Sequence, residues 1–176
     1  LDGGKNGKSN PKKFSSSSQT VTLAKPTKTN YTFSGWYANG TKVKSISAKD
    51  YPAVTLTASW TPKKFYIDYD LNGGKNSAAN VTAQKLADGA LKLSNPTRTG
   101  YTFKGWYTSA DFAEGSKVTS VLGKSKQTIK LYAKWSAKNY KLKYVLADGD
   151  LPVSYTTKYK ITKRVQLPLP TREGYT

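Results

Sequence analysis

Alternation between apolar and polar positions predicts short β-strands along most of the chain. In residues 65–71 every second side chain is aromatic or aliphatic, and residues 140–146 repeat this pattern. A period of two is typical of a strand that buries one face and exposes the other. Residues 72–74 (Asn-Gly-Gly) follow and tolerate positive φ, so we expect the first strand to end in a turn there.

Four further segments follow, three with strand-like patterns and one with a helix-like pattern. Leucines spaced by two at residues 91–93 indicate a second strand, which ends before Pro96 because proline cannot donate to a ladder. Residues 101–107 and 129–135 indicate a third and a last strand. One short helix is predicted within residues 111–122. The expected unit is therefore α+β and mainly β.

The third strand leaves the direction of one aromatic ring open. Strict alternation over residues 101–107 places Trp106 on the face opposite Tyr101 and Phe103. Either Gly105 forms a β-bulge that turns Trp106 inward, or the Trp106 ring lies on the other face of the sheet.

The same blocks of sequence recur along the chain. Residues 26–37 (PTKTNYTFSGWY) return 70 residues later as residues 96–107 (PTRTGYTFKGWY). Residues 56–60 return 75 residues later as residues 131–135, so five residues are inserted between the two blocks, around residues 109–126. Insertions between intact flanks are usually surface loops.

This spacing predicts tandem repeats of about 70 to 75 residues each. Repeat 1 (residues 1–62) lacks its first strand, repeat 2 (residues 63–137) is complete, and repeat 3 (residues 138–176) lacks its second half. We expect the parent sequence to continue beyond Thr176 with another Phe-x-Gly-Trp-Tyr block, because the third copy of the motif is interrupted there.

The motifs Tyr-Thr-Phe-x-Gly-Trp-Tyr at residues 101–107 and Leu-Tyr-Ala-Lys-Trp at residues 131–135 follow the Asn-Gly-Gly turn in a fixed order. In these blocks the chain resembles the Listeria-Bacteroides repeat family, which includes internalin-type repeats. The resemblance covers nearly the whole chain and implies a β-grasp-like module, found in tandem in bacterial surface and secreted proteins, with no catalytic residues to transfer. Repeat 1 departs from the pattern at Asn30 and Thr57, and repeat 3 departs at Asp148.

The chain has a large positive charge that is spread evenly. There are 29 Lys and Arg residues against 10 Asp and Glu residues and no His, which gives a net charge of +19. The excess is +7 in repeat 1, +7 in repeat 2 and +5 in repeat 3. A specific nucleic-acid site would concentrate charge on a recognisable module, and we find none. The even charge suits either loose contact with polyanions or the solubility of a long array.

The residue types exclude most catalytic chemistry. His, Cys and Met are absent, so catalytic triads, thiol nucleophiles, disulfides and the usual transition-metal sites cannot be built. Asp68, Asp70 and Asn72 share one strand face, but calcium takes about six or more oxygens and repeat 3 has Lys141 and Lys143 at this phase. We predict that the chain is not an enzyme and has no metal or other cofactor.

The aromatic residues admit two interpretations. The four Trp residues recur at equivalent places in a repeating motif, which favours a core role because small units must bury large rings. The alternative is a stacking platform for sugars or bases. The predicted core consists of Tyr31, Phe33, Trp36, Trp60, Tyr101, Phe103, Trp106, Leu131 and Trp135. The candidates for ligand contact are Tyr66, Tyr132, Lys104, Lys130 and Lys134.

Together these features predict a non-catalytic repeat module of a bacterial cell-surface or secreted protein. Short linkers at residues 60–64 and 135–139 fit a spacer or stalk. The basic surface fits adhesion to anionic cell-wall polymers, glycosaminoglycans or a host surface protein, shared among the repeats. No segment approaches the roughly 20 apolar residues of a membrane-spanning helix. The alternative is an accessory carbohydrate- or protein-binding module of a secreted enzyme.

Overall fold

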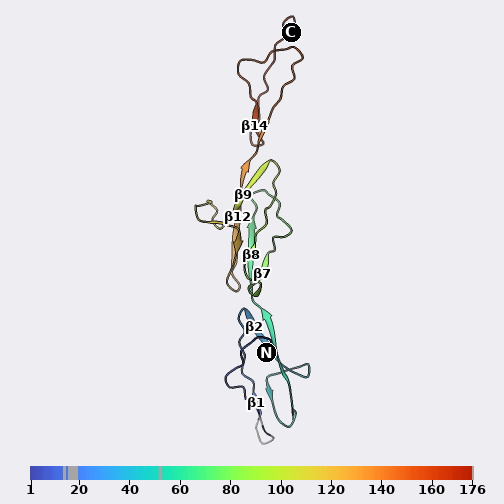
Figure 1. Ribbon diagram of the computed structural model, residues 1–176, viewed down its shortest axis with the longest axis vertical. Coiled ribbons are helices and arrows are strands. Elements are labelled where there is room, and N and C mark those ends of the chain that lie inside the picture. Colours follow the sequence, from blue (N-terminus) through green and yellow to red (C-terminus); the bar gives the residue numbers. More distant parts are fainter. Residues whose placement is uncertain (14, 16–19, 52, 176) are drawn as a thin grey trace. The chain divides into compact units, whose positions relative to one another are not determined.

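The computed structural model describes residues 1–13, 15, 20–51 and 53–175, and the regular structure in them is almost entirely β (Figure 1). The one helical element in this part of the chain is a single 3₁₀ turn, η1 (Leu86–Asp88). The helix predicted within residues 111–122 is wrong. Gly115 has a φ of 84°, which interrupts a helix, and the β-branched Val118 and Val121 lie in strands instead.

Repeat 2 contains one five-stranded sheet. Its strands are β6 (Lys64–Asp70), β7 (Ala83–Lys85), β9 (Tyr101–Tyr107), β10 (Lys117–Val118) and β12 (Thr128–Ala137). Their order in the sheet is β10-β9-β12-β6-β7, and Figure 1 shows β9 and β12 side by side. β9 is antiparallel to β10 and β12, and β7 is antiparallel to β6.

β6 and β12 run parallel to each other. The backbone N of Lys126 donates to the carbonyl of Lys64 at 2.8 Å, and the N of Tyr66 donates to the carbonyl of Gln127 at 2.8 Å. Residue numbers rise together along both segments, which is the parallel pattern. A separate ladder joins β8 (Leu91–Lys92) to β11 (Ser120–Val121).

The other repeats contain the corresponding parts of this arrangement. Repeat 1 has a three-stranded sheet of β3 (Thr41–Val43), β2 (Tyr31–Ala38) and β5 (Leu56–Pro62), and a two-stranded ladder of β1 (Val21–Thr22) and β4 (Ser45–Ile46). Repeat 3 has a hairpin of β13 (Asn139–Lys141) and β14 (Lys158–Lys160).

The described residues group into two compact units. The first consists of residues 1–67, 81–91 and 120–129, and the second of residues 68–80, 92–119 and 130–176. In the first unit Leu23, Trp36, Ile46 and Ala58 form one buried cluster, and Phe65 is fully buried. In the second unit the most deeply buried side chains are Trp106, Leu131 and Ala133.

A β-bulge turns Trp106 inward, which is the first of the two alternatives for this ring. The pairing of β9 with β12 skips one residue at Lys104, and the adjacent Gly105 has a φ of 134°. Trp106 is 2% exposed, and its indole Nε1 donates to the carbonyl of Ser94 at 2.9 Å. Repeat 1 has the same bulge before Trp36. The bulge therefore allows a large ring to enter the core without an unpaired indole N–H.

The five-residue insertion lies in a single hairpin loop. In repeat 1, β2 and β3 are joined by Asn39 and Gly40, with φ values of 47° and 81° that suit a two-residue type I′ turn. In repeat 2, Thr108 donates to the carbonyl of Ser116 at 2.9 Å, and residues 109–115 lie between them. The longer loop accounts for all five inserted residues and lies within the range predicted from the sequence.

Candidate functional site

The outer face of the repeat 2 sheet carries most of the candidate ligand-contact residues. On β12, Leu131 and Ala133 are fully buried, and the residues between and beside them alternate outward. On β6, Phe65 and Ile67 are buried in the same way. The outward side chains of the two strands include Tyr66, Asp68, Lys130, Tyr132 and Lys134.

Lys130 contacts both an acid and an aromatic ring on this face. Its Nζ lies 3.9 Å from Oδ2 of Asp68 and 5.5 Å from the centre of the Tyr132 ring. Both charged side chains are more than half exposed, at 52% and 59%, so this ion pair contributes little stability.

An aromatic cluster forms where the inserted loop returns to the sheet. The rings of Tyr107 and Phe112 meet edge to face with 5.3 Å between their centres. The Nζ of Lys134 lies 5.1 Å from the Tyr107 ring and 5.2 Å from the Phe112 ring. Phe112 therefore brings a half-buried ring from the loop to the outward side of β12.

The loop that carries Phe112 is held by a carboxylate. Oδ1 of Asp111 accepts hydrogen bonds from Oγ of Ser109 at 2.5 Å and from the backbone N of Ala113 at 3.0 Å. These bonds, the first of them above all, lower the pKa of Asp111 because they favour the charged carboxylate. The residues joined by these bonds lie on both sides of Phe112 in the chain. Phe112 has a φ of 57°, a left-handed conformation that is uncommon for an aromatic residue.

Next to this cluster lies a groove of about 360 Å³, which we call the aromatic groove. The residues that line it include Asp70, Arg98, Tyr101, Phe112, Tyr132 and Lys134. The guanidinium carbon of Arg98 stacks 3.8 Å from the centre of the Tyr101 ring. At the rim, Oδ1 of Asp70 accepts from the backbone N of Asn72 at 3.1 Å, and Asn72 Nδ2 donates to the carbonyl of Ala133 at 2.9 Å.

The structure brings together some of the candidate contact residues and separates others. Tyr132 and Lys134 line the aromatic groove, and Lys130 lies against Tyr132. Tyr66 is 45% exposed and is not among the lining residues. Lys104 lies at the bulge and lines a different hollow, beside Trp106.

Eight lining residues were not among the contact residues expected from the sequence: Asp70, Asn72, Arg98, Tyr101, Ala110, Phe112, Ala133 and Trp135. Tyr101 was assigned to the core, yet it is only half-buried. The signal that could have indicated Phe112 is the insertion itself, since it is the one place where repeat 2 gains residues over repeat 1.

Residues assigned to the core from the sequence fall into two groups by exposure. Trp36, Trp106 and Leu131 are buried, at 5%, 2% and 0%. The remaining members are intermediate in exposure, and these are Tyr31, Phe33, Trp60, Tyr101, Phe103 and Trp135. Trp60 and Trp135 each donate from Nε1 to a backbone carbonyl, at 3.1 Å and 2.8 Å, so their indole N–H groups are satisfied.

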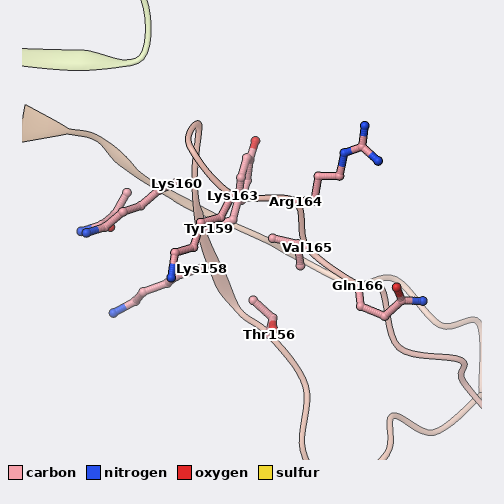
Figure 2. Close-up of a pocket in the computed structure, with 9 residues that line it drawn as sticks. Thr156, Lys158, Tyr159, Lys160, Lys163, Arg164, Val165 and Gln166 are labelled. Carbon is pink, nitrogen blue, oxygen red and sulfur yellow. The ribbon is translucent and has the colours of Figure 1, made fainter.

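A second hollow, of about 420 Å³, lies in repeat 3 and is lined by basic residues that include Lys158, Lys160, Lys163 and Arg164 (Figure 2). In Figure 2 the charged ends of Lys158, Lys160 and Arg164 point in different directions and do not converge on one point. Val165 also lines the hollow. Its counterpart in repeat 2 is Leu91, which lies on β8, the strand that pairs with β11, and is only 9% exposed. The hollow thus lies at a core position of the repeat and is not a candidate ligand site.

The carboxylates of this surface do not form one shared site. In the described part of the chain, no three acidic residues are grouped closely enough to hold a metal ion. Asp68 faces Lys130, and Asp70 accepts from the Asn72 backbone, so the two carboxylates have separate partners.

The Listeria-Bacteroides repeat domain matches the chain over residues 3–59 and 65–134. The chain belongs to this repeat family. The membership confirms the resemblance drawn from the Gly-Trp-Tyr and Leu-Tyr-Ala-Lys-Trp blocks. The repeats of this family are modules of surface proteins, which are a non-enzymatic kind of protein.

Internalin H from Listeria monocytogenes is 40% identical to the chain over 103 residues, which cover 51% of the chain and 18% of that protein. A relative from Evansella cellulosilytica, with the general description of a membrane protein, is 28% identical over 163 residues, which cover 86% of the chain and 23% of that protein. The chain thus spans about a fifth of the length of these relatives. No solved structure matches the chain. Among the described residues, no helix has the length and apolar character needed to cross a membrane.

Proposed function

We propose that the chain is a non-catalytic tandem-repeat module of a bacterial cell-surface or secreted protein, which acts as a spacer or stalk and contacts polyanions. The family membership carries the surface-repeat part of this proposal. The even excess of positive charge carries the polyanion part. The repeats are assigned to residues 1–62, 63–137 and 138–176.

The connections between repeats support the spacer role. One residue, Lys63, separates β5 from β6, and one residue, Lys138, separates β12 from β13. The backbone N of each donates to a carbonyl of the preceding repeat at 2.9 Å, Asn30 for Lys63 and Gly100 for Lys138. A connection with so few free torsions has little conformational entropy to lose when the repeats are ordered along a stalk.

The strand order of repeat 2 supports a β-grasp-like assignment. The order β10-β9-β12-β6-β7 places the first and the last strand of the repeat next to each other at the centre, and these two strands are parallel. The β9–β10 hairpin flanks this central pair on the β12 side, and β7 flanks it on the β6 side. In our proposal the module is a β-grasp-like sheet in which strands and loops occupy the place usually held by a helix.

The partners that fit the charge are anionic cell-wall polymers, glycosaminoglycans or an acidic patch of a host surface protein. Most lysines are exposed, as are Lys5, Lys42, Lys75 and Lys92. Exposed charges in water each contribute about 0–1 kcal/mol and are screened over a Debye length of about 8 Å at physiological salt. Affinity must then come from the number of contacts along the repeats.

Titration of heparin, and separately of teichoic acid, into the chain at low and at physiological salt tests this proposal. We expect binding at low salt that weakens steeply as salt is added, because contacts to a polyanion release its counterions. The absence of binding to both polymers at low salt would contradict the polyanion role. It would leave only the spacer role for the repeats.

The alternative is an accessory carbohydrate- or protein-binding module attached to a secreted enzyme. The aromatic groove favours it, since half-buried rings beside polar groups are typical of sites that bind small ligands. The full-length gene distinguishes the two: a catalytic domain next to these repeats supports the alternative, and a surface anchor with further repeats supports the stalk.

A further inference from the structure

We propose that the aromatic groove of repeat 2 binds an acidic saccharide, with the sugar ring stacked on Tyr132 and its carboxylate bound between Arg98 and Lys134. The inference rests on the proposed polyanion contact. It goes further by naming one class of ligand and one location on the chain. The even charge of the three repeats supplies attraction, and the groove supplies recognition.

Arg98 has no carboxylate partner among the described residues, whereas the equivalent cation in each of the other repeats lies beside an Asp. In repeat 1 the equivalent Lys28 forms an ion pair of 2.8 Å with Asp2, and in repeat 3 the equivalent Arg172 lies 3.7 Å from Asp148. In repeat 2 the residue at the position of Asp2 is Asn72. Within the part of the chain that the structure describes, no carboxylate lies within 4.0 Å of the Arg98 guanidinium or the Lys134 ammonium.

Arg98 is also oriented for an anion. Its guanidinium stacks on Tyr101 at 3.8 Å, which fixes the plane of the group and leaves the N–H donors along its edge available. An oriented guanidinium loses less side-chain entropy when it forms a bidentate pair with a carboxylate.

Lys134 supplies a second positive charge. It is half-buried between Tyr107 and Phe112, at 5.1 Å and 5.2 Å from the two ring centres. Repeat 1 has Ser59 at the position of Lys134.

The rings give the groove an apolar wall that suits a sugar. Tyr132 is half-buried in the groove, and Phe112 lines the groove as well. The C–H face of a sugar ring is apolar with a slight positive charge, and it stacks on the negative face of an aromatic ring. The groove volume of about 360 Å³ lies near the small end of ligand sites, so it suits a short stretch of a polysaccharide rather than a folded partner.

Asp70 favours a saccharide over a polyanion of higher charge density. Its Oδ1 is bound to the backbone N of Asn72, which leaves Oδ2 available to accept a hydrogen bond from a sugar hydroxyl. The same carboxylate repels a ligand with charge at every position, such as polyphosphate. A sugar that carries one acid group and several hydroxyls satisfies the two cations and the acid together.

The test is calorimetric titration of a short oligogalacturonate into the whole chain at about 1 M NaCl, where the Debye length is about 3 Å and distributed attraction is suppressed. We expect binding to persist in the wild type. The double variant Tyr132→Thr/Lys134→Ser introduces the residues that repeat 1 carries in the same strand, so it should fold and should bind at least about tenfold more weakly. Asn72→Asp should weaken binding to a similar degree, because it restores the acid that neutralises the equivalent cation in repeat 1.

The matched control is Tyr66→Thr/Lys92→Ser, which removes the same side-chain types at exposed places outside the groove and should leave affinity within about twofold. Thermal melts establish that each variant is folded. Loss of wild-type binding at high salt, equal affinity in the groove and control variants, or equal affinity for the methyl-esterified oligosaccharide would each overturn the inference. None of these results affects the salt-sensitive polyanion binding of the proposed function, which fails only if neither heparin nor teichoic acid binds at low salt.

Discussion

At the scale of single residues, Trp106 is the side chain on which the core of repeat 2 depends most. It is 2% exposed, and its ring lies 5.5 Å from Phe103 and 5.2 Å from Tyr69. We expect Trp106→Ala to lower the free energy of unfolding by about 3–5 kcal/mol in denaturant melts. Tyr66→Ala is the control and should change it by less than about 0.5 kcal/mol, since Tyr66 is 45% exposed. A loss below about 1 kcal/mol for Trp106→Ala would mean that the ring is not part of the core.

Burial raises the pKa of Tyr69 to about 12, from an ordinary value of 10.0. The folded chain therefore holds this proton more tightly than the unfolded chain does. The stabilisation is complete below pH of about 10 and is lost as pH rises toward about 12. We expect Tyr69→Phe to remove this part of the alkaline loss of stability, measured as the midpoint of urea unfolding between pH 9 and pH of about 12. An unchanged pH dependence in Tyr69→Phe would show that another group is responsible.

Residues were predictable from the sequence where a strand pattern or a comparison between repeats indicated their role, and not where they lie in a loop. The inward turn of Trp106 required only that Gly105 be recognised as a bulge residue, and the sequence offered that alternative. Phe112 was missed because loops have no periodicity, so nothing in the sequence showed that its ring returns to Tyr107. The free charge of Arg98 was visible only by comparing Asn72 with Asp2 at the same place in repeat 1.

At the scale of elements, the inserted loop should be separable from the fold. Replacing residues 109–115 by Asn-Gly, the turn found in repeat 1, should keep or raise the free energy of unfolding, by up to about 1 kcal/mol, because a shorter loop has less entropy to lose. Denaturant melts measure this, and the oligogalacturonate titration should show loss of binding in the same variant. A large loss of stability, above about 2 kcal/mol, would show that Phe112 belongs to the core instead.

Strands were predicted better than their connections. The four main strands of repeat 2 follow from period-two patterns, and all four occur in the sheet or in the β8–β11 ladder. The short β10 and β11 were mistaken for a helix, because two-residue strands give too few positions to establish a period. The parallel pairing of β6 with β12 lies beyond what a local pattern can indicate, since it joins segments about 60 residues apart.

At the scale of the whole molecule, the repeat and the family were readable because large blocks of sequence recur in a fixed order. The partner was not readable in the same way. Charge indicates the sign of a ligand but not its shape, and shape depends on side chains that only the fold brings together.

The measurement that tests the central claim most directly compares two sets of charge-removing substitutions in the whole chain. One variant carries Lys→Gln at four exposed positions of repeat 1, which are Lys5, Lys8, Lys42 and Lys44. The other carries Lys→Gln at four exposed positions of repeat 2, which are Lys75, Lys85, Lys92 and Lys124. The probe is poly-glutamate, a polyanion without sugar rings, titrated at low and at physiological salt.

We expect both variants to lose affinity for poly-glutamate to the same extent, and both to show a shallower dependence on salt than the wild type, because repeats 1 and 2 each contribute an excess of +7. A loss confined to one variant, with the other unchanged, would contradict an attraction shared among the repeats.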